Sequence, residues 1–150
     1  MVVRLSESKA LKASSLFSNT LCIGCDTSAV LGDEILGKPL DFEDAVSQWK
    51  RMSGQEVAFL SGIALAQNQE ILWSDCVPTF VKIRELSDSE ISAYLHLEQP
   101  FQSCASFKSE TSACALIEFM KSDDPSAIIG LPMIALSKKL RDLEITPFKD

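Results

Sequence analysis

Five charged residues have the types and settings that suit chemistry on a phosphorylated ligand. Two are carboxylates and three are lysines: Asp26, Glu110, Lys9, Lys38 and Lys108. Ammonium groups neutralise phosphate oxygens, and a carboxylate can bind a divalent metal or activate a water molecule. Their spacing alone does not establish a site, so each residue is first interpreted in its local setting.

Lys9 lies within a predicted helix, Val2 to Phe17. The apolar stripe predicted for this helix is formed by Val2, Leu5, Ala13 and Leu16, and Lys9 falls on it. A lysine in this place either runs its aliphatic stem past the core into solvent or points its ammonium into a cleft. The first arrangement is the commoner for a lysine, and the helix pattern leaves both open.

Asp26 lies inside a predicted strand, Leu21 to Leu31, and Gly32-Asp33 follows this strand as a tight turn. A carboxylate in an apolar strand is costly to desolvate, so it should meet a cation or face a cleft. The alternative is that Asp26 forms an Asx turn that ends the strand.

The other three charged residues lie in predicted loops. Pro39 fixes its own φ and biases Lys38 toward an extended backbone, so Gly37-Lys38-Pro39 presents one ammonium rigidly. Lys108 and Glu110 lie in a small, polar segment, Pro100 to Thr111. An isolated loop lysine is more often solvated than bound to phosphate.

Helical and extended patterns alternate along the chain and predict one domain over residues 1–150. The remaining predicted elements are a helix Phe42 to Met52 capped by Asp41, a hairpin of Val57 to Ala66 with Ile71 to Glu85, a helix from the Ser87 capping box to Leu97, a strand Ser112 to Met120 and a closing helix with Met133, Leu136, Leu140 and Leu143 inward. The fold class is therefore α/β, a mixed twisted sheet with an antiparallel hairpin flanked by helices.

The composition excludes several classes of function. A net charge of −7 argues against a nucleic-acid groove, and no stretch reaches the length of a membrane span. Cys22 and Cys25 form a C-x-x-C in an apolar strand, but without a second pair we interpret them as buried thiols rather than a zinc or redox site. The reduced-thiol pattern and the lack of a leader predict a cytoplasmic protein.

Six segments in order resemble the Maf proteins from residue 3 to about residue 143. They are R-L-S-E-S-K-A (4 to 10), I-G-C-D-T-S-A-V-L (23 to 31), D-E-I-L-G-K-P (33 to 39), L-S-D-S-E-I-S-A-Y (86 to 94), S-F-K-S-E (106 to 110) and I-G-L-P-M (129 to 133). Each segment is weak evidence alone, but their order and spacing together make coincidence improbable.

The resemblance implies a nucleoside triphosphate pyrophosphatase, which cleaves between the α and β phosphates with Mg²⁺, Mn²⁺ or Co²⁺. By this resemblance Asp26 activates the attacking water directly or through the metal, and Lys9, Lys38 and Lys108 hold the triphosphate. Glu110 matches a second carboxylate near the metal or the base. Homodimers are common among the proteins that this chain resembles.

The motifs point to a preferred substrate and to alternatives. F-K-S-E resembles the branch of the family that acts on 7-methyl-GTP, whereas Thr27 after Asp26 is more like the branch that acts on dTTP and UTP. The family's first strand, first helix and S-x-S-P-R-R loop have no counterpart in this sequence, which therefore looks N-terminally truncated. The alternative to an enzyme is an inactive nucleotide-binding or regulatory protein.

Overall fold

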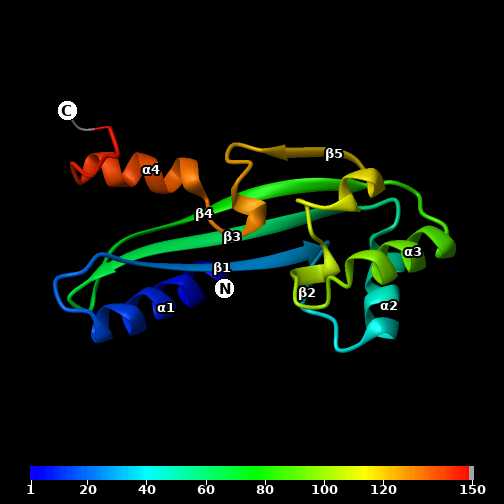
Figure 1. Cartoon of the computed structure of the whole chain (residues 1–150), viewed down its shortest axis with the longest axis horizontal. Helices are drawn as coiled ribbons and strands as arrows, with labels where there is room; N and C mark the ends of the chain where they lie inside the picture. The colour runs from blue at the N-terminus through cyan, green and yellow to red at the C-terminus, as the bar shows by residue number, and fades with distance from the viewer. Residues whose placement is uncertain (149–150) are drawn as a thin grey trace. The chain divides into compact units, whose positions relative to one another are not determined.

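The computed structural model describes residues 1–148, and its elements alternate as the sequence predicts (Figure 1). In order along the chain they are α1 Val2–Leu16, β1 Cys22–Leu31, β2 Glu34–Leu36, α2 Phe42–Met52, β3 Glu56–Gln67, β4 Glu70–Ile83, α3 Asp88–Glu98, β5 Ile117–Ser122 and α4 Met133–Asp142. Short 3₁₀ turns occupy Cys104–Ser106, Ser112–Leu116 and Ala127–Ile129. None of the helices within residues 1–148 has the length and apolar character needed to cross a bilayer.

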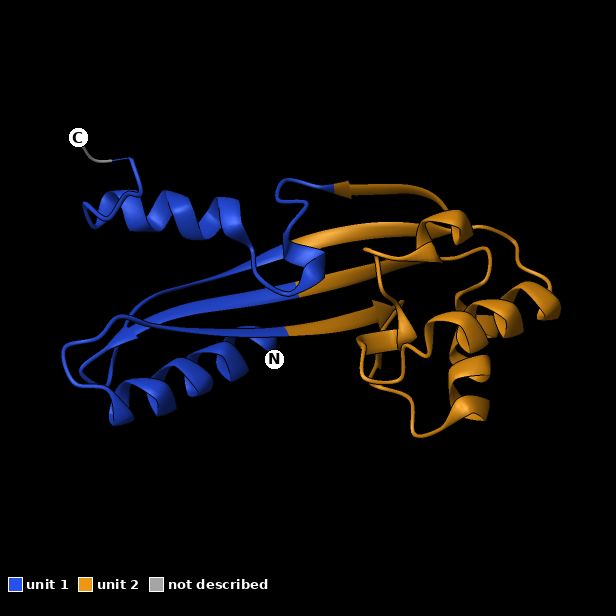
Figure 2. Cartoon of the chain, in the orientation of Figure 1, with its two compact units in different colours: residues 1–26, 61–77, 122–150 blue, residues 27–60, 78–121 orange. Residues whose placement is uncertain are grey.

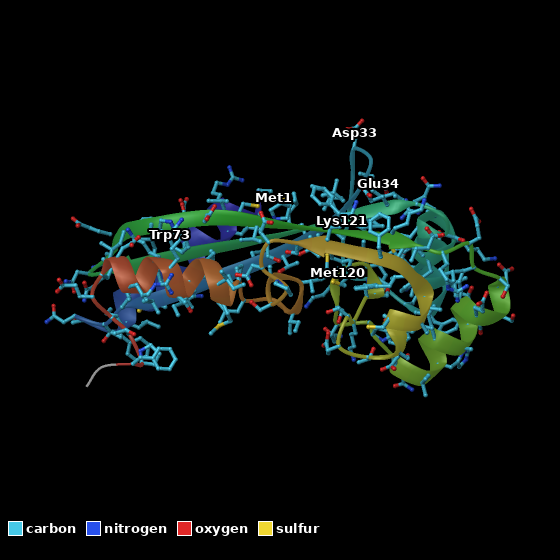
Figure 3. All side chains as sticks on the ribbon, turned by 90° about the horizontal axis from the view of Figure 1, so that it is seen from above. Met1, Asp33, Glu34, Trp73, Met120 and Lys121 are labelled. Carbon is cyan, nitrogen blue, oxygen red and sulfur yellow. The ribbon has the colours of Figure 1, made fainter. Side chains whose placement is uncertain are left out.

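The strands form a sheet in the order β2-β1-β3-β4-β5, which confirms the α/β class with an antiparallel hairpin. Strands β3 and β4 are joined by Asn68 and Gln69, whose φ angles of 51° and 66° are both left-handed. Two left-handed residues match the twist of hairpin strands, so this turn fixes the register of the pair. Strands β1 and β2 are also antiparallel, and Asp33 projects from the turn between them (Figure 3).

The chain divides into two compact units (Figure 2). Unit 1 comprises residues 1–26, 61–77 and 122–150, and unit 2 comprises residues 27–60 and 78–121. Residues 149–150 lie outside the described part of the chain. A single domain over residues 1–150 stays a prediction.

In unit 1, helix α1 uses only part of the predicted apolar stripe, because Val2 is buried but Leu5 and Leu16 are exposed. Its buried residues are Val2, Ser6, Ala10 and Ser14, whereas Leu16 is 72% exposed. The reason is the shape of the surface that the helix meets. A Cβ on Gly24 would lie 2.1 Å from the Ser6 carbonyl oxygen, and a Cβ on Gly62 would lie 2.8 Å from the Val2 carbonyl oxygen. The helix backbone therefore lies directly against strands β1 and β3, and only small side chains fit between them.

Helix α4 is anchored at its start by a buried carboxylate, Asp124. One carboxylate oxygen accepts hydrogen bonds from the Ile134 and Ala135 amides at 2.7 and 3.0 Å, and the other accepts from the Ser126 amide and hydroxyl. With its start fixed in this way, α4 buries only Leu136 completely, against Ile63 and Leu65 of β3. The expected burial of Met133 and Leu143 is therefore wrong, since both are exposed.

In unit 2, helices α2 and α3 lie against each other (Figure 1). Aromatic side chains of this unit pack together in its core. The buried Trp49 ring packs on Tyr94 with ring centroids 4.9 Å apart, and Phe107 packs on Phe59 at 5.0 Å. Local signals predicted both helix starts correctly. The Asp41 carboxylate accepts from the Asp44 amide at 2.8 Å, and Ser87 with Glu90 forms the expected capping box.

The predicted strand Ser112 to Met120 is only half correct, because the strand begins at Ile117. Residues Ser112–Leu116 form a 3₁₀ turn instead. The Ser112 amide and hydroxyl both donate to the Glu98 carboxylate. This bonding ties the start of the segment to helix α3 rather than to a neighbouring strand.

The glycine contact under α1 gives a first test. We expect Gly24→Ala to lower the free energy of unfolding by at least about 2 kcal/mol, because the new Cβ would overlap the α1 backbone. Gly37→Ala is the control, since a Cβ there meets nothing within 4 Å, and it should change stability by less than about 0.5 kcal/mol. Urea unfolding measures both variants, and equal stabilities would contradict the close packing of α1.

The Asp124 anchor gives a test that depends on pH. Burial alone would raise the pKa of Asp124, but hydrogen bonds from Ser126, Ala135 and Ile134 outweigh burial and lower that pKa below its ordinary value. A lowered folded-state pKa means that the carboxylate stabilises the fold at neutral pH. This contribution is lost as the pH falls through the folded pKa, below the unfolded value of about 3.9.

We therefore expect Asp124→Asn to lower the free energy of unfolding by about 1–3 kcal/mol at pH 7. The difference from the unmodified protein should shrink as the pH falls below about 4. Asp123→Asn alters the exposed neighbouring carboxylate and is the matched control. Thermal unfolding across the pH range measures all three proteins, and a difference that does not change with pH would rule out ionised Asp124 as the anchor.

Candidate functional site

Lys9 and Asp26 form an ion pair in unit 1. The Lys9 ammonium donates to an Asp26 carboxylate oxygen at 2.7 Å and to the Cys25 carbonyl oxygen at 2.8 Å. The Lys9 side chain is 56% exposed and that of Asp26 only 19%. The carboxylate in the apolar strand thus meets the cation expected for it, and its place inside β1 excludes a turn that ends the strand. The Lys9 side chain does not simply extend into solvent, because its ammonium is hydrogen-bonded to Cys25 and Asp26 of β1.

The close packing of α1 produces this pair. Gly24 precedes Asp26 by two residues on β1, and its missing side chain lets the α1 backbone approach at Ser6 and Ala10. Lys9, next to Ala10, is thereby brought within reach of Asp26. An ion pair with one partner this exposed stabilises a fold by only about 0–1 kcal/mol. The pair therefore contributes little to the stability of the fold.

Cys25, beside Asp26, is half-buried, and Cys22 is buried. Burial raises the pKa of the Cys25 thiol, although the nearby Lys9 ammonium opposes the shift. All five cysteines are free. Within residues 1–148, no group of three or more His, Cys, Asp and Glu residues could hold a metal ion.

The other predicted site residues lie in unit 2. Lys38 is exposed in the segment that follows β2, and Lys108 is half-buried in the segment that follows α3. The two segments are joined by the Ala105 amide, which donates to the Gly37 carbonyl oxygen at 3.0 Å. The structure therefore brings together the backbones that carry Lys38 and Lys108.

Lys108 and Glu110 differ in how firmly they are held. The Lys108 amide donates to the Tyr94 hydroxyl at 3.2 Å, but its ammonium makes only a long bond of 3.4 Å, to the Glu98 carbonyl oxygen. The backbone is fixed while the ammonium can readily change partners. Glu110 is exposed, and its carboxylate accepts a long bond of 3.4 Å from the neighbouring Ser109 hydroxyl.

The carboxylates present can supply part of a metal site. Asp26 in unit 1 and Glu110 in unit 2 offer oxygen ligands of the kind that Mg²⁺ and Mn²⁺ prefer. Mg²⁺ is commonly held by one or two carboxylates together with substrate phosphates, and it needs no cage built from protein alone. The donor chemistry fits an ion that arrives with a nucleotide.

The sequence did not indicate the role of Tyr94. The ring is buried, but its hydroxyl bonds to both Ser106 and Lys108. A buried tyrosine hydroxyl needs a partner, and this requirement was the available signal. This requirement alone does not identify the loop that provides the hydrogen-bond partner.

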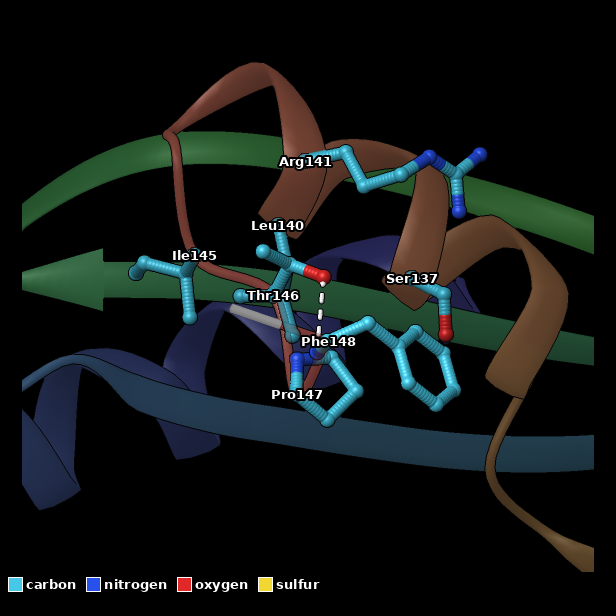
Figure 4. A pocket seen from close by; sticks show the side chains of 7 residues that line it. All are labelled: Ser137, Leu140, Arg141, Ile145, Thr146, Pro147 and Phe148. Atoms are coloured by element: carbon cyan, nitrogen blue, oxygen red, sulfur yellow. Dashed lines mark hydrogen bonds between the residues drawn. The ribbon is translucent and has the colours of Figure 1, made fainter. Parts of the chain in front are cut away.

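A small pocket lies near the C-terminal end of α4 and contains none of the five predicted site residues (Figure 4). Its lining comes from unit 1 and consists of Ser137, Leu140, Arg141, Ile145, Thr146, Pro147 and Phe148. We assign it no part in the chemistry.

Comparison with known proteins agrees with the order of the motifs. The family model described as Maf-like protein matches residues 1–143. A 7-methyl-GTP pyrophosphatase of Methylobacillus flagellatus is 46% identical over 136 residues, 89% of this chain and 70% of that protein. Proteins of the same name from Bordetella avium and Vibrio cholerae are 39% and 42% identical, over 99% and 95% of this chain and 75% and 74% of their own lengths. The chain belongs to the Maf family.

Proposed function

We propose that this chain is a nucleoside triphosphate pyrophosphatase that acts on 7-methyl-GTP. The contact between Lys9 and Asp26, at 2.7 Å inside the I-G-C-D-T strand, is the observation that carries the proposal. The names of the similar proteins, 7-methyl-GTP pyrophosphatases, support the choice of substrate. The F-K-S-E segment favours the same substrate.

In this proposal Asp26 is the catalytic carboxylate. It accepts a proton from a water molecule whose oxygen attacks the α phosphorus. The bond between that phosphorus and the oxygen bridging to the β phosphorus then breaks, and the bridging oxygen leaves with pyrophosphate. Lys9 holds Asp26 through one carboxylate oxygen. Such pre-positioning of the base and water supplies much of the rate acceleration in phosphoryl transfer.

The lysines offset the negative charge that gathers on the leaving pyrophosphate. Lys38 is exposed and rigidly presented by Pro39, and Lys108 has a fixed backbone with a loosely held ammonium. Cations placed before the reaction stabilise developing charge without reorganising during it. In the same proposal, Lys9 contributes a third cation beside the base.

A divalent ion, Mg²⁺, Mn²⁺ or Co²⁺, belongs to the proposal. The family resemblance suggests Asp26 and Glu110 as candidate ligands for this ion, each considered by itself, and the nucleotide phosphates would provide further ligands. The ion would screen the charge of the triphosphate. The nucleotide is the proposed partner, and a homodimer is a further proposal that the mass in solution would test.

The function is tested by incubating the protein with Mg²⁺ and 7-methyl-GTP, dTTP or UTP. We expect release of pyrophosphate and a nucleoside monophosphate, fastest with 7-methyl-GTP. A preference for dTTP and UTP would support the assignment suggested by Thr27. No release from any of the three by a folded protein, with a nucleotide-dependent rise in melting temperature, would instead indicate an inactive nucleotide-binding protein.

Asp26→Asn removes the charge and keeps the shape, and it should reduce turnover at least about 100-fold. Stability should change by no more than about 1 kcal/mol, because the ion pair is partly exposed. Asp33→Asn alters an exposed carboxylate on the turn after β1 and should retain activity. Near-normal turnover by Asp26→Asn would reject the assigned role.

Lys108→Ala should act on the transition state more than on nucleotide binding. We expect kcat to fall by about 10- to 100-fold while KM changes much less, because charge on pyrophosphate grows as the bond breaks. Lys121→Ala removes an exposed lysine of the same unit and serves as the control. An effect confined to KM would show that Lys108 binds substrate and transition state equally.

A further inference from the structure

The hydroxyl of Tyr94 joins two points of the segment that carries Lys108. It donates to the Ser106 carbonyl oxygen at 3.1 Å and accepts from the Lys108 amide at 3.2 Å. Burial raises the pKa of Tyr94, so this hydroxyl keeps its proton and stays a donor at neutral pH. One buried group thus holds the backbone on both sides of Phe107.

The backbone just before Lys108 has an unfavourable conformation. Ala105 and Ser106 have φ angles of 53° and 52°, in the left-handed region that residues with a side chain seldom adopt. Two such residues in succession persist only where surrounding contacts fix them. The Ser106 carbonyl oxygen accepts a second hydrogen bond, from the Trp49 indole at 3.3 Å. Tyr94 and Trp49 together therefore hold this carbonyl in place.

Helix α3 holds the other end of the segment with a residue one turn further on. Glu98 follows Tyr94 by four residues, a spacing that puts both side chains on one face of the helix. The Glu98 carboxylate accepts from the Ser112 amide at 3.1 Å and from the Ser112 hydroxyl. Hydrogen bonds from Ser112 hold the pKa of Glu98 below its ordinary value. Lys108 lies between Ser106, which is bonded to Tyr94, and Ser112, which is bonded to Glu98.

We infer that Tyr94 is a positioning residue for the Lys108 ammonium, acting through the backbone of residues 106–108. The inference rests on the proposed function, in which Lys108 offsets charge on the leaving pyrophosphate. The Tyr94 hydroxyl is bonded on both sides to protein backbone, so its effect on the reaction passes through Lys108. Small displacements of a charge-stabilising group cost large factors in rate.

Tyr94→Phe removes the hydroxyl and keeps the ring that packs on Trp49, so the aromatic core should remain. We expect kcat with 7-methyl-GTP to fall by about 10-fold with little change in KM. In the Lys108→Ala background the same substitution should have almost no further effect, because the group that Tyr94 positions is already absent. Amide hydrogen exchange of residues 106–112 should become faster, which can be measured without turnover.

Ser61→Ala is the matched control, since it removes another buried hydroxyl, which donates to the Ala127 carbonyl oxygen at 2.6 Å in unit 1. Its kinetic effect should be small, and it should combine additively with Lys108→Ala. Additive effects of Tyr94→Phe and Lys108→Ala, or unchanged exchange of residues 106–112, would overturn the positioning role in an active protein. An unmodified protein without turnover would overturn the proposed function and this catalytic role together, whereas exchange would still report whether the hydroxyl holds the loop.

Discussion

The close approach of the α1 backbone to strands β1 and β3 is the constraint on which the candidate chemistry depends. Gly24 and Gly62 remove the Cβ atoms that would keep the helix away, and Ser6 and Ala10 are small enough to fill the remaining space. A helix held further out by larger side chains would carry Lys9 away from β1. The Asp26 carboxylate would then lie in an apolar strand without its cation, at a cost in desolvation.

The three candidate lysines of this acidic chain lie in different structural settings. The Lys9 ammonium is held by an ion pair, and the backbone of Lys108 is held by a hydrogen bond to Tyr94, whereas Lys38 is exposed in the segment after β2. A net charge of −7 disfavours extended polyanions, but a compact triphosphate needs only a few well-placed ammonium groups. Whether the chain can bind a compact triphosphate depends on where individual lysines lie, and the net charge of the chain gives no information on that.

The sequence predicted those parts of the fold whose signals are local. Both caps, at Asp41 and Ser87, and the β3–β4 hairpin depend on residues within a few positions of one another, and all three were correct. The buried face of α1 was predicted only in part, since Val2 is buried but Leu5 and Leu16 are exposed. The helix meets glycines from two strands distant in the sequence, so the shape of that surface decides which residues are buried.

The candidate site shows the same limit. A cation beside Asp26 could be expected, because a carboxylate in an apolar strand needs one, but the sequence did not identify Lys9 as that cation. The left-handed backbone at Ala105 and Ser106 could not be predicted, because neither residue is glycine. It depends on hydrogen bonds to the Ser106 carbonyl oxygen from Trp49 and Tyr94, which lie 57 and 12 residues away in the sequence.

The polar network behind Lys108 explains how an unfavourable backbone can persist in a small protein. Among the described residues, every buried side-chain nitrogen or oxygen has a hydrogen-bond partner. A fully satisfied buried network fixes one arrangement, whereas a partly satisfied one would favour relaxation of the loop. The strain at Ala105 and Ser106 is thus offset by bonds that also set the direction of the chain at Lys108. Stability given up locally thus fixes the backbone that carries Lys108, whose ammonium makes a long bond of 3.4 Å to the Glu98 carbonyl oxygen.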